Sequence, residues 1–184
     1  MRKEGAMKRH PALAYPDDSV LVVIDPQEKL VRMIHKREEV VETIKRMIEF
    51  ASIFAIPVVL TEHYPKGLGY SVEEIKEVLP SYDPVIKRIF SCFGVPEFSE
   101  ALAATGRNRL LVVGIETHIC VCQTVHDALN QGYLVQVVAD GTGTRKREDH
   151  EIALARMRQE GAVVTTSEAL IYEALTAAPT EVRA

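Results

Sequence analysis

The feature that most constrains the fold is a repeated alternation of short apolar runs with segments of helical periodicity. Apolar runs rich in valine and leucine occupy residues 19–25, 56–61, 109–115, 133–139 and 162–165. Runs that are apolar at nearly every position are typical of parallel strands buried on both faces. Between them, apolar side chains recur at intervals of three and four residues, which indicates amphipathic helices. The chain is therefore predicted to form parallel strands joined by helical connections.

The order of these elements predicts the architecture. A sixth, short strand is expected over 85–89, after a short helical patch over 72–79. The remaining helices are expected over 38–55, 97–104, 118–130, 147–160 and 167–175. Strands that alternate with helices and connect with a right hand form an open sheet between two helix layers. The predicted fold class is α/β, a three-layer α-β-α Rossmann-like open sheet of six mostly parallel strands.

The length of 184 residues fits one domain, since domains run to roughly 150 residues. We expect a flexible N-terminal lead over 1–17, one folded domain over 18–176 and a C-terminal tail over 177–184. No apolar run approaches the roughly 18 residues of a membrane span, and the first residues do not resemble a secretory signal. The sequence therefore predicts no membrane partner.

The charge and the cysteine count exclude further classes of protein. The chain has 22 basic and 26 acidic residues, a net charge of −4, whereas nucleic-acid binders usually carry a basic surface. Three cysteines are an odd and low number, which argues against a disulfide framework. We expect a cytoplasmic protein that acts on a small molecule and binds no nucleic acid.

Three chemically useful side chains follow strands of the predicted sheet. Asp25 ends the first strand, Lys87 belongs to the short strand, and Cys120 follows the strand over 109–115. Ligands of open parallel sheets bind outside the carboxyl ends of the strands, so these side chains can meet at one edge. A cysteine in the first turn of a helix is favoured as the nucleophilic thiolate, and a nearby lysine lowers its pKa further. The pattern predicts covalent catalysis, with Asp25 taking the thiol proton.

Each of these residues also has a structural interpretation. A lone cysteine at a helix start is more often a small buried apolar residue, a lone lysine is usually solvated, and an aspartate at a strand exit often caps a turn. Cys122 is expected to face the core because residues two apart on a helix point about 200° apart. Cys92 could border the pocket or simply pack.

Four segments carry a family resemblance. VVIDPQEKL, TEHYPKGLG, PVIKRIFSCFG and VVGIETHICVCQTVHDAL, in this order, resemble the isochorismatase-like cysteine hydrolases. The resemblance runs from Ser19 to Leu175. The second segment and the ending ARMRQEGAVVTTSEALIYEAL are most similar to the isochorismatase domain-containing subgroup.

The resemblance implies a triad of Asp25, Lys87 and Cys120. Cys120 would attack a small amide, or a related non-peptide C–N bond, and form an acyl-enzyme, with Asp25 as general base and Lys87 holding the pair. It also implies a cis peptide bond between Ile115 and Glu116. The backbone N–H groups of Glu116 and Cys120 would then form the oxyanion hole.

We expect a substrate pocket that includes Gln27, Tyr64, Phe93 and Thr117. Gln27 matches the Asp-x-Gln of the family, which implies that it orders the first loop. Phe90, near Phe93, is a further aromatic candidate, although aromatic side chains are core residues by default. The family also forms homo-oligomers, so we expect a dimer, a tetramer or a larger assembly.

The sequence predicts no metal and no cofactor. Nicotinamidases of the family bind a divalent ion through an Asp-x-His and a later His, whereas here Glu62 would meet the Asp and Tyr64 replaces the first His. His63 is one residue out of register. A zinc site needs three or four ligands, and at most two are present. His63 is therefore expected to be a polar group at the pocket rim or a simple loop residue.

Other functions stay open as alternatives. The chain could be a non-catalytic interaction or scaffold protein on the same fold, or a metal-dependent nicotinamidase-type enzyme. A flavodoxin-like nucleotide binder is disfavoured because Gly141-x-Gly143 lacks the third glycine of a dinucleotide fingerprint. Arg145, which follows these glycines, is expected to form a structural or interface ion pair.

Overall fold

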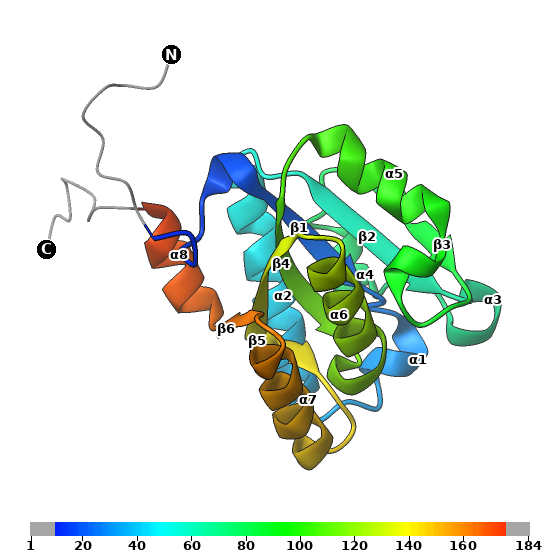
Figure 1. Cartoon of the computed structure of the whole chain (residues 1–184). Helices are drawn as coiled ribbons and strands as arrows, with labels where there is room; N and C mark the ends of the chain where they lie inside the picture. Colours follow the sequence, from blue (N-terminus) through cyan, green and yellow to red (C-terminus); the bar gives the residue numbers. More distant parts are fainter. Residues whose placement is uncertain (1–9, 176–184) are drawn as a thin grey trace, which may run out of the picture.

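The structure, a computed structural model, describes residues 10–175 and places one six-stranded sheet between two layers of helices (Figure 1). The strands are β1 (Ser19–Ile24), β2 (Val58–His63), β3 (Val85–Lys87), β4 (Arg109–Ile115), β5 (Leu134–Gly143) and β6 (Val163–Thr165). Their order is β3-β2-β1-β4-β5-β6, and every pairing is parallel. The predicted fold class is confirmed.

The helices divide between the two faces of the sheet (Figure 1). One face carries α2 (Arg37–Ile53), α4 (Glu73–Lys76) and α8 (Ser167–Leu175). The other carries α5 (Pro96–Thr105), α6 (Cys122–Asn130) and α7 (Arg147–Gln159). The short α1 (Glu28–Val31) and α3 (Pro65–Leu68) follow β1 and β2.

Strand β1 explains why both layers are needed. All six of its residues are buried, and neighbouring side chains of a strand point to opposite faces. Leu21 and Val23 join the core under α2, whereas Val20 and Val22 join the core under α5 and α6. We call these the α2-side core and the α6-side core.

The strand order reverses between β1 and β4. From β1 the chain runs outward through β2 to β3, and it then returns to place β4 on the other side of β1. Such a reversal leaves a crevice at the carboxyl ends of the two neighbouring strands, where open α/β sheets bind their ligands. The segments that follow β1 and β4 carry Asp25 and Cys120.

Several element boundaries differ from the prediction. Strand β5 continues to Gly143 rather than ending at residue 139, and the strand expected over 85–89 ends at Lys87. The helix expected over 118–130 begins with a π-helical turn, Thr117–Val121, before α6. Strand β2 extends to His63 rather than ending at Thr61, because Glu62 and His63 pair with β3. Two residues expected in a loop therefore have the fixed directions of strand side chains.

The N-terminal lead also differs in part. Residues 1–9 and 176–184, which include the predicted tail, lie outside the described residues. Within the described part, Ala14 is buried and its N–H donates to the Glu173 carboxylate of α8 at 2.8 Å. The amide of Gln136 on β5 donates to the Ala12 carbonyl at 2.6 Å. Residues 10–17 thus belong to the folded body rather than to a flexible lead.

Between residues 10 and 175, no helix combines the length and the apolar character that crossing a membrane requires.

Candidate active site

Asp25 lies immediately after β1, where the backbone turns. Its φ is 49°, in the left-handed region, and its N–H donates to the Thr61 carbonyl at 3.1 Å. The carboxylate is fully buried. Oδ1 accepts a hydrogen bond from the Thr61 hydroxyl at 2.7 Å, and Oδ2 accepts one from Lys87 Nζ at 2.6 Å. Both oxygens of Asp25 are therefore fixed by side chains of β2 and β3.

Lys87 reaches this carboxylate from the end of β3, two strands away. Its side chain is completely buried, and Nζ also donates to the Phe90 carbonyl at 3.1 Å. Burial by itself lowers the pKa of Lys87, but the attraction of Asp25, with smaller contributions from Cys92 and Cys120, raises it above its usual value. The lysine is thus a permanent cation in a buried site.

Cys120 lies in the π-helical turn and is 6% exposed. Burial raises the pKa of its thiol well above the usual value, and the charge of Asp25 raises it further, while Lys87 opposes both effects. These effects favour the neutral thiol as the resting form, whereas the helix start and the nearby lysine were expected to favour the thiolate. The loss of hydration outweighs the helix start and the lysine on which that expectation was based.

The charges nevertheless allow a thiolate to form during reaction. Asp25 and Lys87 make a buried ion pair, and the charges of both residues act on the pKa of the nearby Cys120 thiol. If the thiol proton moves to Asp25, the negative charge moves to sulfur and the site still holds one cation and one anion. The transfer therefore avoids the large cost of creating an additional buried charge.

The turn between β4 and Cys120 depends on a glycine. Gly114 has a φ of 125°, and a Cβ at this position would lie 2.1 Å from the Ile24 carbonyl oxygen. Only glycine permits this close approach of β4 to β1. The Ile115–Glu116 peptide bond that follows is cis, as the family resemblance implies.

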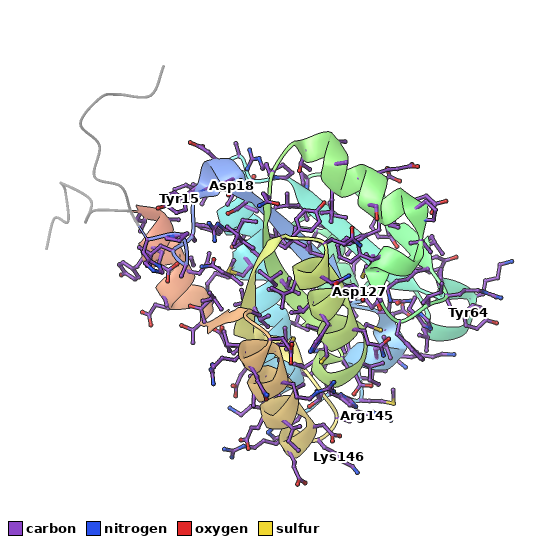
Figure 2. All side chains as sticks on the ribbon, viewed as in Figure 1. Tyr15, Asp18, Tyr64, Asp127, Arg145 and Lys146 are labelled. Atoms are coloured by element: carbon purple, nitrogen blue, oxygen red, sulfur yellow. The ribbon has the colours of Figure 1, made fainter. Side chains whose placement is uncertain are left out.

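Glu116 fixes the start of the π-helical turn. Its carbonyl accepts hydrogen bonds from the N–H groups of Ile119 and Val121, at 3.0 and 3.3 Å. Its side chain is buried, and Oε2 accepts from the backbone N–H and the Nε of Arg145, at 3.2 and 3.1 Å. Arg145 thus forms the structural ion pair expected of it, at the beginning of α7 (Figure 2).

Two of the four predicted pocket residues are occupied by other contacts. Gln27 is buried, with Nε2 donating to the carbonyls of His63 and Gly69 and Oε1 accepting from the His63 N–H at 2.6 Å. It ties the end of β2 to the following loop. Thr117 is also buried, and its hydroxyl pairs with Nδ1 of His150 at 2.9 Å.

The two aromatic pocket candidates lie in different places, Tyr64 at the surface and Phe93 in the core. Tyr64 is 40% exposed at the edge of the molecule beside α3 (Figure 2), with the Arg88 guanidinium 4.4 Å from its ring centre. Phe93 packs edge-on against Phe98, at 5.0 Å between ring centres, in the α6-side core. The structure therefore brings Asp25, Lys87 and Cys120 together, whereas a pocket role for Gln27, Tyr64, Phe93 and Thr117 stays a prediction.

One contact residue, Thr61, was not predicted from the sequence, although its hydroxyl holds Asp25. The feature that could have identified Thr61 is the parallel register of β1 and β2. Thr61 is the partner of Ile24 and therefore lies beside Asp25, the next residue. Phe90 contributes its carbonyl oxygen rather than its ring to Lys87, and no sequence pattern predicts that contact.

The other two cysteines are buried. Cys122 packs in the α6-side core, as predicted. Cys92 is fully buried beside the site: its N–H donates to the Thr124 hydroxyl at 3.0 Å, and its thiol donates to the Thr61 hydroxyl at 3.8 Å. Burial, with a smaller contribution from Asp25, raises the pKa of Cys92 to about 12. All three cysteines are free thiols.

A groove of about 930 Å³ lies elsewhere on the protein, between α2, the end of β5 and the start of α7. Asp25, Lys87 and Cys120 do not line it. The candidate triad therefore lies outside this groove.

Comparison with known proteins identifies the family. The Isochorismatase domain family model matches residues 19–169, which include every residue of the site. The chain belongs to the isochorismatase family. It is 39% identical over 166 residues to isochorismatase domain-containing protein 2 of Bos taurus, covering 89% of this chain and 79% of that protein.

Two solved structures of the isochorismatase fold are similar to the structure of this chain. The MAR1 ribonuclease of Caenorhabditis elegans superposes with a TM-score of 0.84 at 38% identity, covering 90% of this chain and 85% of that one. YcaC from Pseudomonas aeruginosa, solved with hexane-2,5-diol and covalent acrylamide, gives a TM-score of 0.86 at 26% identity. That match covers 92% of this chain and 86% of YcaC.

The residues at the position of the nicotinamidase metal site do not fit a metal ion. Glu62 is fully buried, and its Oε1 accepts hydrogen bonds from the N–H and hydroxyl of Ser71 and from the hydroxyl of Tyr82, at 2.6 to 2.8 Å. These groups act as hydrogen-bond donors, whereas a divalent ion needs further ligand atoms with lone pairs, such as those of imidazole. In the described part of the chain, no three His, Cys, Asp or Glu side chains converge on one point.

Proposed function

We propose that the protein hydrolyses a small-molecule amide, or a related non-peptide C–N bond, through an acyl-enzyme on Cys120. The observation that carries this proposal is the fully buried Lys87–Asp25 ion pair, 2.6 Å long, beside the Cys120 thiol. A buried ion pair is often no more stabilising than an apolar pair of the same size, so its presence favours a chemical role. Membership of the isochorismatase family supports a hydrolase.

In the first half of the reaction, Asp25 takes the proton of Cys120 as the sulfur attacks the carbonyl carbon. Lys87 then faces the developing thiolate, whose pKa it lowers. The carbonyl oxygen becomes an oxyanion, for which we propose the backbone N–H groups of Glu116 and Cys120 as donors. Protonated Asp25 gives its proton to the departing nitrogen, the C–N bond breaks, and an amine or ammonia leaves.

In the second half, a water molecule replaces the amine. Asp25 removes a proton from this water, which attacks the thioester carbonyl. The C–S bond breaks, the thiolate of Cys120 recovers the proton from Asp25, and the carboxylic acid product leaves. Asp25 is therefore the base and the acid in turn, and Lys87 stays charged throughout.

The covalent acrylamide in the structure of Pseudomonas aeruginosa YcaC supports a nucleophile in that relative. Primary amides are the first substrates to test here because the proposed reaction breaks an amide C–N bond. The sequence of this chain, with its net charge of −4, does not provide the basic surface that a ribonuclease would use to bind phosphates. RNA nevertheless belongs in the panel because the Caenorhabditis elegans relative is named a ribonuclease.

The experiment is a screen of small primary amides, ureido compounds and an RNA oligonucleotide with three forms of the protein. The wild type and Cys92→Ser are expected to release ammonia from at least one amide, and Cys120→Ala is expected to release none. Cys92→Ser is the matched control because Cys92 is also buried and contacts Thr61. Equal activity in Cys120→Ala would overturn the proposal, and inactivity of the wild type on every compound would favour the scaffold alternative.

Two further proposals accompany this one. We propose a homo-oligomer, which light scattering of the purified full chain would measure, with a monomer as the contradicting result. We also propose a cytoplasmic protein, which microscopy of a tagged full chain would test.

A further inference from the structure

His63 lies on the same face of the sheet as the candidate triad. It is the last residue of β2, and its parallel partner on β3 is Lys87. Partner residues of neighbouring strands point to the same face, and residues two apart on one strand do so too. His63 therefore shares its face with Lys87 and with Thr61, which holds Asp25.

The His63 ring lies beside these groups, next to an aromatic side chain. It stacks on Phe90, with 5.5 Å between ring centres and 22° between planes. The backbone carbonyl of Phe90 accepts a hydrogen bond from Lys87, and the ring of Phe90 is half exposed. The stacked pair thus lies between the buried ion pair and solvent.

One nitrogen of this ring is unused. Nδ1 of His63 is buried and has no hydrogen-bond partner within the described residues. An unpaired buried polar atom costs about 1–3 kcal/mol, so it is a natural position for a ligand to complete. By contrast, both polar atoms of the Gln27 side chain are occupied.

The ring is neutral, so this nitrogen can accept a hydrogen bond. Burial and the positive charge of Lys87 lower the pKa of His63, and they outweigh the opposing effects of Asp25 and the Ile89 backbone. A neutral imidazole has one N–H and one lone pair. We assign the proton to Nε2, which leaves the lone pair on the unpartnered Nδ1.

We propose that Nδ1 of His63 accepts a hydrogen bond from the N–H of the scissile amide and so selects amides over esters. The inference rests on the proposed function and names the group that recognises the leaving nitrogen. Holding one N–H in this way turns the nitrogen lone pair toward Asp25, which must protonate it. An ester has no proton to offer at this position, so it loses the contact.

The test compares three primary amides with the methyl esters of the same acids: acetic, benzoic and nicotinic. For each pair the ratio of kcat/KM for amide and ester is measured in the wild type, His63→Phe and Phe90→Leu. His63→Phe keeps a ring to stack on Phe90 but removes the acceptor. We expect it to lower the ratio by about 10- to 100-fold, the effect of one hydrogen bond to substrate, with ester hydrolysis changed less than about threefold.

Phe90→Leu removes the stack and keeps the acceptor, so its ratio is expected to stay at the wild-type value. His63→Gln, which offers a side-chain oxygen as acceptor, is expected to recover part of the ratio. An unchanged ratio in His63→Phe, or equal loss of amide and ester hydrolysis, would overturn the inference and leave the proposed function standing. Failure of the wild type on all six compounds would instead count against the proposed function and the inference together.

Discussion

Asp25 and Glu62 are two fully buried carboxylates at the ends of neighbouring strands, yet their surroundings differ in kind. Asp25 is held by the cation of Lys87 and lies beside the thiol of Cys120. Glu62 is held by the neutral donors of Ser71 and Tyr82. Neighbouring residues of a strand face opposite ways, so Glu62 lies on the opposite face from Thr61, which contacts Asp25.

This difference separates a carboxylate that can exchange protons from one that anchors a loop. In the proposed mechanism, Cys120 transfers its proton to Asp25 while the charge of Lys87 balances the remaining negative charge. Burial and the hydrogen bond to Glu62 raise the pKa of Tyr82, so its hydroxyl keeps its proton and remains a donor. The partner of a buried carboxylate, rather than its place in the sheet, therefore determines what the carboxylate does.

The largest expected difference is in catalysis. Asp25→Asn removes the group that protonates the leaving nitrogen and activates the water, and it is expected to lower amide hydrolysis by about 10³-fold, within the range of general acid–base catalysis. Glu62→Gln keeps an acceptor oxygen for Ser71 and Tyr82 and is expected to stay within about threefold of the wild type. Initial rates on the best amide of the screen measure both. Equal losses of hydrolysis in the two variants would contradict the proposed difference between Asp25 and Glu62.

The next difference is in stability. Lys87→Met leaves the Asp25 carboxylate buried without its cation, which is expected to lower the free energy of unfolding by about 3–5 kcal/mol. Tyr82→Phe removes one neutral donor from Glu62 and is expected to cost about 1 kcal/mol. Urea unfolding followed by circular dichroism gives both values. A smaller loss for Lys87→Met than for Tyr82→Phe would contradict the assigned roles.

The smallest effects come from the hydroxyl groups beside each carboxylate. Thr61→Val removes the hydrogen bond to Asp25 Oδ1 and is expected to lower kcat about 3- to 10-fold, since one hydrogen bond contributes about 1 kcal/mol. Ser71→Ala removes a hydrogen bond to Glu62 of similar length and is expected to leave kcat unchanged. A kcat effect in Ser71→Ala as large as that in Thr61→Val would show that the two sites are coupled.

The fold was predictable because its signals are local. The apolar runs of β1 and β4 identify strands buried on both faces, and the helical periodicity between the runs identifies the layers. The N-terminal boundary was not predictable, since the burial of Ala14 depends on contacts with α8 that are distant in sequence.

The site was predictable in its residues more than in its chemical state. Strand ends and the family resemblance identified Asp25, Lys87 and Cys120, which the structure brings together. The neutral thiol of Cys120 was not predictable, because its pKa depends on burial in the folded protein. The direction of His63 was missed because pairing with β3 extends β2 by two residues beyond the predicted end.

The central claim is that Asp25 and Lys87 control the proton of Cys120 in opposite directions. The most direct measurement is the rate of Cys120 alkylation by iodoacetamide between pH 6 and 10, followed by intact mass in a Cys92→Ser, Cys122→Ser background. Asp25 raises the pKa of Cys120 and Lys87 lowers it, so Asp25→Asn should shift the rate profile to lower pH and Lys87→Met should shift it to higher pH. A shift of one unit in pKa changes the thiolate fraction about tenfold. The account predicts alkylation at pH 7 at least about tenfold faster in Asp25→Asn than in the parent, although hydrolysis is lost; alkylation no faster in Asp25→Asn, or faster in Lys87→Met, would contradict it.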